Sequence, residues 1–119
     1  RSLDLLEIEI DHFTVLERDG SIIACAALYP YPESQIAELA CLAVADEYQD
    51  LGRGKQLLIT LEQQAQSIGL NTLCVLTTQT THWFIEQGFN AAEITDLPIA
   101  KQSLYNFQRN AKVLKKTLA

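Results

Sequence analysis

The sequence contains no apolar run close to the roughly 20 residues that a membrane-spanning helix needs, and no signal peptide opens it. It also shows no internal repeat and no low-complexity linker. A hydrophobic content of 48% is ordinary for a soluble globular protein. We therefore expect a single compact domain over residues 1–119, located in the cytoplasm and without a membrane as partner.

Basic residues are scarce in most of the chain. Residues 1–100 hold all 15 Asp and Glu but only four Lys and Arg, whereas residues 101–119 hold five basic residues and no acidic one. Because nucleic-acid phosphates are bound by clustered Lys and Arg, the acidic body argues against nucleic acid as a partner. The basic tail is either a small partner patch or a solvated strand near an anionic ligand.

Cysteines are few and do not follow a metal-binding pattern. Cys25, Cys41 and Cys74 are odd in number, lie in apolar strand-like runs and show no C-x-x-C spacing. They therefore indicate neither a zinc site nor a disulfide framework. We expect no metal, and three buried free thiols in a reducing compartment.

Turn residues and apolar runs predict several strands, over residues 13–18, 21–29, 36–44, 72–77 and 106–118. Asp19-Gly20 is typical of a two-residue hairpin turn, so the first two strands form a hairpin. The third strand is almost entirely apolar and is therefore central, with Glu38 as its one charged residue. Buried acids are rare without a partner or a function.

Helices are predicted before and between these strands. One covers residues 3–12, and another follows Gly54 and ends near Gly69, with apolar side chains at helical spacing at Leu57, Leu58, Leu61 and Ala65. A shorter helix covers residues 80–87 and is ended by Gly88. Another short helix begins at Asp96. Three aromatic residues in or just after the helix at 80–87 are assigned to the core: Trp83, Phe84 and Phe89.

The strand, helix and strand between residues 36 and 77 form a right-handed crossover. This connection makes the strands 36–44 and 72–77 parallel. Because the hairpin before them is antiparallel, the sheet is mixed. The predicted fold class is α/β (α+β), with a mixed central sheet flanked by helices.

A glycine-bearing helix start follows the central strand, with the spacing Gln49-x-x-Gly52-x-Gly54. Backbone N–H groups there have no intrahelical acceptor and point outward with the positive end of the helix dipole, which favours phosphate. Arg53 and Lys55 add positive charge, and glycine keeps side chains away from the anion. An ordinary glycine-marked helix start is the alternative. A P-loop is disfavoured because residues 49 and 56 are both Gln.

This spacing resembles the acyl-CoA pyrophosphate loop of the GNAT superfamily of N-acetyltransferases. Further segments resemble, in order along the chain, the acetyltransferase domain of bacterial N-acetylglutamate synthases, namely CAALYP at 25–30, ELACLAV at 38–44, VLTT at 75–78, HWFIEQGF at 82–89 and LYNFQR at 104–109. The resemblance implies a GNAT fold, in which the two parallel strands splay apart and the pantetheine arm of CoA lies in the gap. It implies acetyl transfer from acetyl-CoA to the α-amino group of L-glutamate, the first step of arginine biosynthesis.

The protonated amine of such a substrate requires a base, and Glu38 is the candidate because it is a carboxylate four residues before the point where the strands are expected to separate. The resemblance places the base at this position too, although an edge-facing or capping carboxylate is the alternative. The resemblance assigns Thr77 as the hydroxyl near the departing sulfur, with Tyr105 as the competing acid. A dicarboxylate also needs guanidinium groups, for which Arg109 matches the family's arginine and Arg1 is a second candidate.

The residues expected to contact acetyl-CoA extend from the central strand into the following helix, with one from the parallel partner strand. They are Cys41, Leu42, Ala43, Val44, Gln49, Asp50, Leu51, Gly52, Arg53, Gly54, Lys55 and Leu76.

The resemblance also implies a longer polypeptide. In the usual layout an amino-acid-kinase-like domain that carries arginine inhibition precedes the acetyltransferase, and another layout joins it to a different arginine-pathway enzyme. We expect residues 1–119 to be the C-terminal fragment of such a chain, lacking the domain's first strand, and the full-length protein to be a homo-oligomer. Two alternative functions remain: acetylation of another amino acid or a peptide amine, and a non-catalytic CoA-binding regulatory module.

Overall fold

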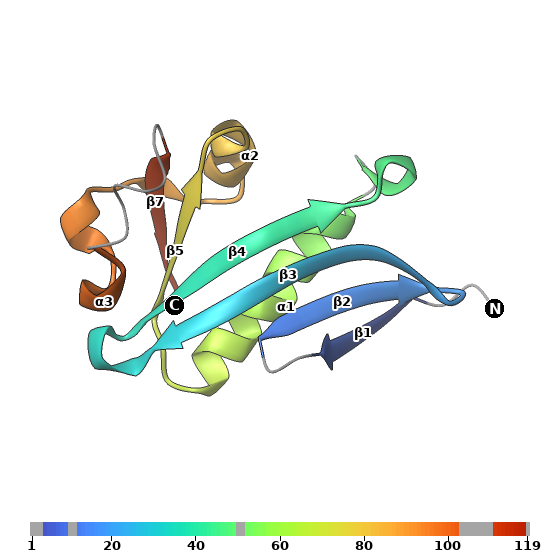
Figure 1. Cartoon of the computed structure of the whole chain (residues 1–119), viewed down its shortest axis with the longest axis horizontal. Helices are drawn as coiled ribbons and strands as arrows, with labels where there is room; N and C mark the ends of the chain where they lie inside the picture. Colours follow the sequence, from blue (N-terminus) through green and yellow to red (C-terminus); the bar gives the residue numbers. More distant parts are fainter. Residues whose placement is uncertain (1–3, 10–11, 50–51, 103–110, 119) are drawn as a thin grey trace.

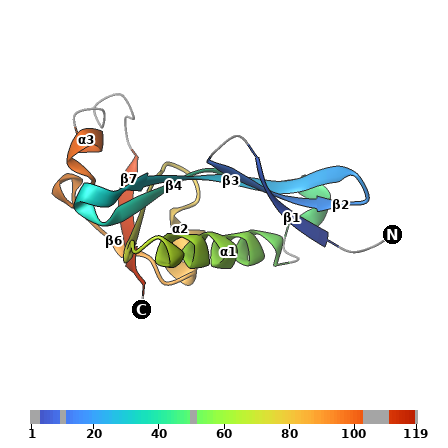
Figure 2. The ribbon, with the colours of Figure 1, turned by 90° about the horizontal axis from the view of Figure 1, so that it is seen from below.

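A computed structural model describes residues 4–9, 12–49, 52–102 and 111–118. In these ranges the strands form one mixed sheet in the order β1-β2-β3-β4-β5-β7-β6. The view in Figure 2 places α1 and α2 on one side of this sheet and α3 on the other. The elements are β1 Asp4–Glu9, β2 Phe13–Arg18, β3 Ser21–Tyr31, β4 Ile36–Val44, α1 Arg53–Ser67, β5 Thr72–Thr77, α2 Thr81–Glu86, β6 Asn90–Ala91, α3 Ile99–Gln102 and β7 Lys112–Thr117.

The predicted hairpin is confirmed between β2 and β3, which pair in antiparallel orientation. Asp19 and Gly20 form its turn and both have positive φ, 50° and 85°. This is the backbone pattern of a type I′ turn, whose twist matches that of the flanking strands. β3 continues to Tyr31, two residues beyond the predicted end, and Pro32 begins a 3₁₀ turn.

The helix predicted over residues 3–12 is wrong, because residues 4–9 form β1, which pairs along its whole length with β2. In the sequence Leu6 and Ile8 alternate with Glu7 and Glu9, a period of two that suits a strand. A helix of about ten residues is marginal by itself, whereas a strand here extends an existing sheet. Pairing with β2 therefore decides the conformation.

The parallel pair predicted from the crossover is confirmed, with α1 connecting β4 to β5. The paired register runs from Ile36 opposite Thr72 to Leu39 opposite Val75. Beyond these residues the two strands diverge (Figure 1). The last paired residue of β4 directly follows Glu38, so the strands separate earlier than the predicted four residues after it. This carboxylate therefore lies at the start of the opening.

The core lies mainly between α1 and the sheet. The helix contributes the predicted apolar residues, which are all buried: Leu57, Leu58, Leu61 and Ala65. They pack with residues of β3 and β4 that include Ala26, Leu28, Ala37 and Leu39. Leu70 N–H donates to Ala65 O at 2.9 Å, and Gly69 has a φ of 86°, which confirms the glycine-terminated helix end.

A β-bulge interrupts the pairing of β3 with β4 between Cys25 and Ala27, where β4 carries one extra residue at Cys41. Cys41 has a φ of 58°, a left-handed conformation that is uncommon outside glycine. The extra residue shifts the alternation of β4, so that Leu39 before the bulge and Leu42 after it both pack against the main core. The bulge lies where β4 leaves β5.

The last predicted strand begins outside the described residues, and its described portion is β7, antiparallel to β5. The short helix predicted from Asp96 is confirmed as α3, preceded by a 3₁₀ turn at Ile94–Asp96. The two-residue β6 was not predicted. Asp96 accepts a hydrogen bond from Glu93 N–H at 2.8 Å and one from Lys115 Nζ at 3.1 Å, and these contacts lower the pKa of its carboxyl.

Lys116 of β7 links α1 to the segment just after α2. Its ammonium donates to Glu62 Oε2 of α1 at 2.7 Å and to the backbone oxygen of Gln87, just after α2, at 2.9 Å. The two charged side chains are only 26% and 17% exposed. Removing the donor leaves a largely buried carboxylate and carbonyl without this cation.

We expect Lys116→Met to lower the free energy of unfolding of this domain by about 2 kcal/mol, the usual contribution of hydrogen bonds to charged groups. Denaturant unfolding would measure the loss. The matched control is Lys112→Met, an exposed lysine of the same strand. Equal losses in the two variants would show that the bridge adds nothing beyond an ordinary surface lysine.

Candidate active site

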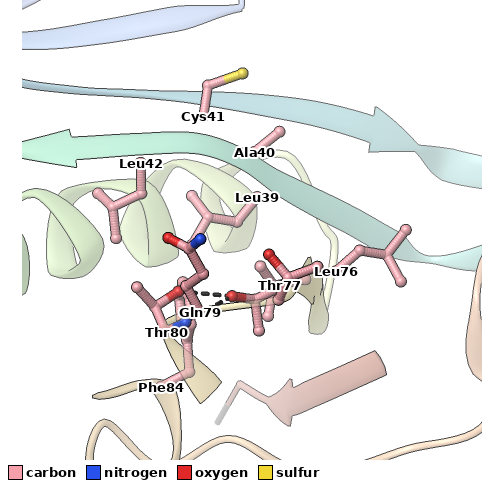
Figure 3. A pocket seen from close by; sticks show the side chains of 11 residues that line it. Leu39, Ala40, Cys41, Leu42, Leu76, Thr77, Gln79, Thr80 and Phe84 are labelled. Carbon is pink, nitrogen blue, oxygen red and sulfur yellow. Dashed lines mark hydrogen bonds between the residues drawn. The ribbon is translucent and has the colours of Figure 1, made fainter. Parts of the chain in front are cut away.

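A cavity of about 270 Å³ occupies the opening between the diverging ends of β4 and β5. Figure 3 shows Leu39 and Leu42 reaching into it from β4, while Thr77, Gln79 and Thr80 come from the end of β5 and the turn after it. Its walls combine backbone of the unpaired strand ends with apolar side chains and hydroxyls. Its full lining is Leu39, Ala40, Cys41, Leu42, Val75, Leu76, Thr77, Thr78, Gln79, Thr80 and Phe84.

A second cavity, of about 590 Å³, adjoins the first, and the two share Leu42 and Thr80 in their walls. It lies between the end of β4, the first turn of α1 and one face of α2, and is lined by Leu42, Ala43, Val44, Gln49, Gly52, Arg53, Gly54, Lys55, Thr80, Trp83 and Gln87. Volumes of this size are typical of small-molecule sites. Together the cavities follow β4 from the bulge to the start of α1.

The two glycines of the loop are required for different reasons. Gly52 is the N-cap of α1 with a φ of 80°, and a Cβ there would meet nothing within 4 Å. Backbone conformation therefore favours glycine at this position. Gly54 has an ordinary helical backbone, but a Cβ would lie 3.2 Å from Trp83 Cζ2 and 3.6 Å from Val44 Cγ2. Space favours glycine here.

The start of α1 suits an anion. This 15-residue helix directs its first backbone N–H groups toward the second cavity, whose wall also carries Arg53 and Lys55. Gln49 braces the loop that leads there, because its side-chain amide donates to Val44 O at 3.1 Å and to Asp46 Oδ1 at 3.3 Å. The arrangement fits a phosphate-bearing ligand.

The structure brings most of the predicted cofactor-contact residues together. All described residues that were predicted to contact a cofactor line one of the two cavities, namely Cys41, Leu42, Ala43, Val44, Gln49, Gly52, Arg53, Gly54, Lys55 and Leu76. Asp50 and Leu51 lie outside the described residues. The role of every one of these residues toward a ligand remains a prediction.

Trp83 packs against the main core, as predicted, but the core is not its only contact. Phe84 and Phe89 are buried as predicted, and their rings lie 5.1 Å apart. Trp83 is only partly buried and lines the larger cavity beside Gly54. Thr80 and Gln87 of the same segment were also missed as lining residues. Trp83, Thr80 and Gln87 follow the spacing of one helical face, which was the available signal.

The expectation of three buried thiols holds only for Cys74. Cys25 is half-buried, and Cys41 is exposed because the bulge turns it out of the regular strand alternation. In Figure 3 the Cys41 side chain points away from the cavity. Burial raises the pKa of the Cys25 thiol, and the neighbouring Cys41 thiol adds to the rise. Cys25 therefore stays protonated at neutral pH.

Glu38 is only 6% exposed. Its neighbours Ala37 and Leu39 face the α1 side, so Glu38 faces the opposite side of the sheet, between Tyr29 of β3 and Cys74 of β5. Glu38 does not belong to the described cavity walls, but the strands open at the next residue. The other predicted substrate and acid residues, Arg1, Tyr105 and Arg109, lie outside the described residues.

Thr77 ends β5 and is 9% exposed. Its hydroxyl oxygen lies 2.7 Å from Thr80 Oγ1 and accepts a hydrogen bond from Thr80 N–H at 3.0 Å. The predicted hydroxyl therefore lines the smaller cavity, held in place by the turn that follows. Within the described ranges, no group of three His, Cys, Asp or Glu side chains gathers as a metal site, and no helix is long and apolar enough to span a membrane.

These features define an α/β protein whose parallel strand pair opens into two adjoining cavities that reach a helix start, an arrangement that fits an elongated phosphate-bearing ligand. Residues 2–89 match the model of the acetyltransferase (GNAT) family. The chain belongs to this family. Its fold class is therefore confirmed, including the splayed strands.

Relatives and solved structures agree with this assignment. The chain is 55% identical over 118 residues to an amino-acid acetyltransferase of Pseudomonas paraeruginosa, covering 99% of this chain and 27% of the relative. It is 54% identical over 114 residues to that of Serratia proteamaculans, covering 96% and 26%. N-acetylglutamate synthase from Neisseria gonorrhoeae, complexed with coenzyme A and N-acetyl-glutamate, matches with a TM-score of 0.87 and 35% identity, covering 98% of this chain and 29% of that chain. The chain thus spans about a quarter of the length of these curated relatives.

Proposed function

We propose that this domain transfers the acetyl group of acetyl-CoA to the α-amino group of L-glutamate, which would serve the first step of arginine biosynthesis. The observation that carries the proposal is the continuous groove from the α1 N-terminus to the opening beside Glu38. It is supported by the relatives named amino-acid acetyltransferase and by the similar synthase that binds coenzyme A and N-acetyl-glutamate.

The groove fits CoA in shape and charge. Arg53, Lys55 and the first N–H groups of α1 would hold the pyrophosphate, in space that a Cβ at Gly54 would narrow. Leu42 and Leu76 would contact the pantetheine arm in the smaller cavity. Unpaired backbone of β4 beyond Leu39 offers hydrogen bonds to its amides, as an added strand would. Bound acetyl-CoA supplies an activated thioester.

The chain's own residues then supply proton transfer and orientation. Glu38 takes a proton from the substrate amine, directly or through water. The electron pair of the amine nitrogen is then free to attack the carbonyl carbon of the thioester. When the carbon–sulfur bond breaks, its electron pair goes to sulfur. Thr77 or Tyr105 donates to that sulfur. Backbone N–H groups near the bulge at Cys41 would stabilise the carbonyl oxygen, and Arg109 and Arg1 would bind the substrate carboxylates.

The same proposal places this chain in a larger polypeptide. An amino-acid-kinase-like domain, or another arginine-pathway enzyme, would be joined to it, and the protein would be a homo-oligomer in the cytoplasm. The relatives' greater length supports the larger polypeptide. Thermodynamic coupling between the domains would then carry arginine inhibition.

A thiol-release assay with acetyl-CoA and a panel of amino acids and peptide amines tests the substrate. We expect turnover with L-glutamate well above that with glutamine or alanine, because two carboxylates are to be bound. We also expect Arg109→Gln to raise KM for glutamate about 10- to 100-fold, the usual effect of losing a charge-assisted pair. Preference for another amine would reassign the acceptor, whereas tight CoA binding without turnover would indicate a regulatory module.

A further inference from the structure

Thr80 stands at the start of α2, but its hydroxyl does not cap that helix. A threonine at the N-cap ordinarily accepts a hydrogen bond from a backbone N–H one turn into the helix. Within the described residues Thr80 makes no such bond. Its Oγ1 lies instead 2.7 Å from Thr77 Oγ1, as the dashed line in Figure 3 marks. The hydroxyl is therefore committed to Thr77.

The hydrogen bonds around Thr77 Oγ1 limit where its proton can point. A hydroxyl has one proton and two lone pairs, and one lone pair accepts Thr80 N–H at 3.0 Å. If Thr77 donates to Thr80, its single proton is used inside the turn. If Thr80 donates to Thr77, both lone pairs are occupied and the Thr77 proton is left to point elsewhere.

The second arrangement directs the proton into the smaller cavity. Thr77 and Thr80 both line that cavity. They face the apolar wall that Leu39 and Leu42 form on its other side. A hydroxyl that accepts two hydrogen bonds is polarised and becomes a stronger donor. Thr80 is exposed, so its oxygen can accept from water while its own proton goes to Thr77. Thr77 is buried, so a ligand atom in the cavity would be the acceptor for its proton.

We propose that Thr80 is a positioning residue whose hydroxyl donates to Thr77 Oγ1 and thereby aims the Thr77 proton at the sulfur of the bound thioester. The proposal rests on the acetyl-transfer function proposed above. As the carbon–sulfur bond breaks and its electron pair moves to sulfur, the Thr77 hydroxyl donates a hydrogen bond to the developing thiolate. The amine proton goes to Glu38, and water protonates the released thiolate.

Thr80→Val tests this arrangement, because it keeps the shape and the backbone N–H but removes the hydroxyl. We expect kcat to fall about tenfold, while the dissociation constant of CoA, followed by the fluorescence of Trp83, changes less than twofold. Thr80→Ser should restore kcat. The matched control is Thr81→Val, the adjacent threonine outside the cavity walls, which should leave both quantities unchanged.

A double variant distinguishes positioning from an independent effect. If Thr80 acts through Thr77, the Thr77→Val/Thr80→Val protein should have the same kcat as Thr77→Val. Additive losses, a change in KM alone, or a fall in kcat no larger than that of Thr81→Val would overturn the proposal. The proposed function would survive these results if glutamate is still acetylated in a Glu38-dependent manner. Absence of turnover in the unaltered protein would overturn both.

Discussion

Replacing Glu38 by Gln is expected to lower kcat at neutral pH by about 10²- to 10⁴-fold, the usual contribution of a general base. The amide has the same shape, so the buried position at the edge of the opening stays filled. It cannot accept the amine proton, so the reaction depends on the amine that is already unprotonated. That fraction grows as the pH rises, and activity should therefore recover partly at alkaline pH.

Steady-state rates between about pH 6 and 10, together with CoA binding, measure this effect across the range in which an amine loses its proton. We expect the dissociation constant of CoA to be nearly unchanged, since Glu38 belongs to neither cavity wall. Glu33→Gln is the matched control because Glu33 is an exposed acid in the 3₁₀ turn before β4 and belongs to neither cavity wall. Undiminished activity of Glu38→Gln at neutral pH would remove Glu38 as the base.

The second large effect is expected from Gly54→Val, which should raise KM for acetyl-CoA about 10- to 100-fold, with a smaller change in kcat. The added side chain enters the space between α1 and Trp83, where even a Cβ would lie 3.2 Å from the indole. Holding the pyrophosphate away from one backbone N–H removes a charge-assisted hydrogen bond, which accounts for the magnitude. Gln63→Val, on the exposed face of the same helix, is the matched control.

Trp83 makes the cause of this effect testable. CoA binding is measured by titration calorimetry, because Trp83 is the sole tryptophan of these 119 residues and its fluorescence is lost when it is replaced. If the contact with the indole is responsible, Gly54→Ala should weaken binding in the native background and less so when combined with Trp83→Leu. If exclusion of phosphate is responsible, the smaller residue at 83 gives no relief. Unchanged binding in Gly54→Val would exclude the loop from the site.

The described residues include only part of the predicted catalytic and substrate-binding set. The described residues contain the groove, the base candidate and Thr77, whereas Arg1, Tyr105 and Arg109 fall outside them. The choice between Thr77 and Tyr105 as donor to sulfur therefore depends on the Thr77 and Thr80 variants. A large kcat loss in Thr77→Val would favour the threonine, because its hydroxyl lies in the cavity wall.

Local signals were sufficient wherever the chain's structure depends on residues close in sequence. The turn at Asp19-Gly20, the buried face of α1 and the glycine end of that helix each depend on a few adjacent positions. The crossover follows from chain connectivity, which makes β4 and β5 parallel whatever their side chains. The helix start that we propose as the phosphate site was equally predictable, because it consists of backbone groups and two glycines.

Tertiary pairing decided the features for which local pattern was ambiguous. Residues 4–9 carry apolar spacing compatible with a helix or a strand, and β2 selects the strand. The bulge at Cys41 comes from matching β4 to β3 while it separates from β5, so neither its left-handed backbone nor the exposed thiol is visible in an apolar run. Trp83 and Thr80 look like a core residue and a helix cap. They face the groove because α2 packs beside the opening, a consequence of contacts between segments far apart in sequence.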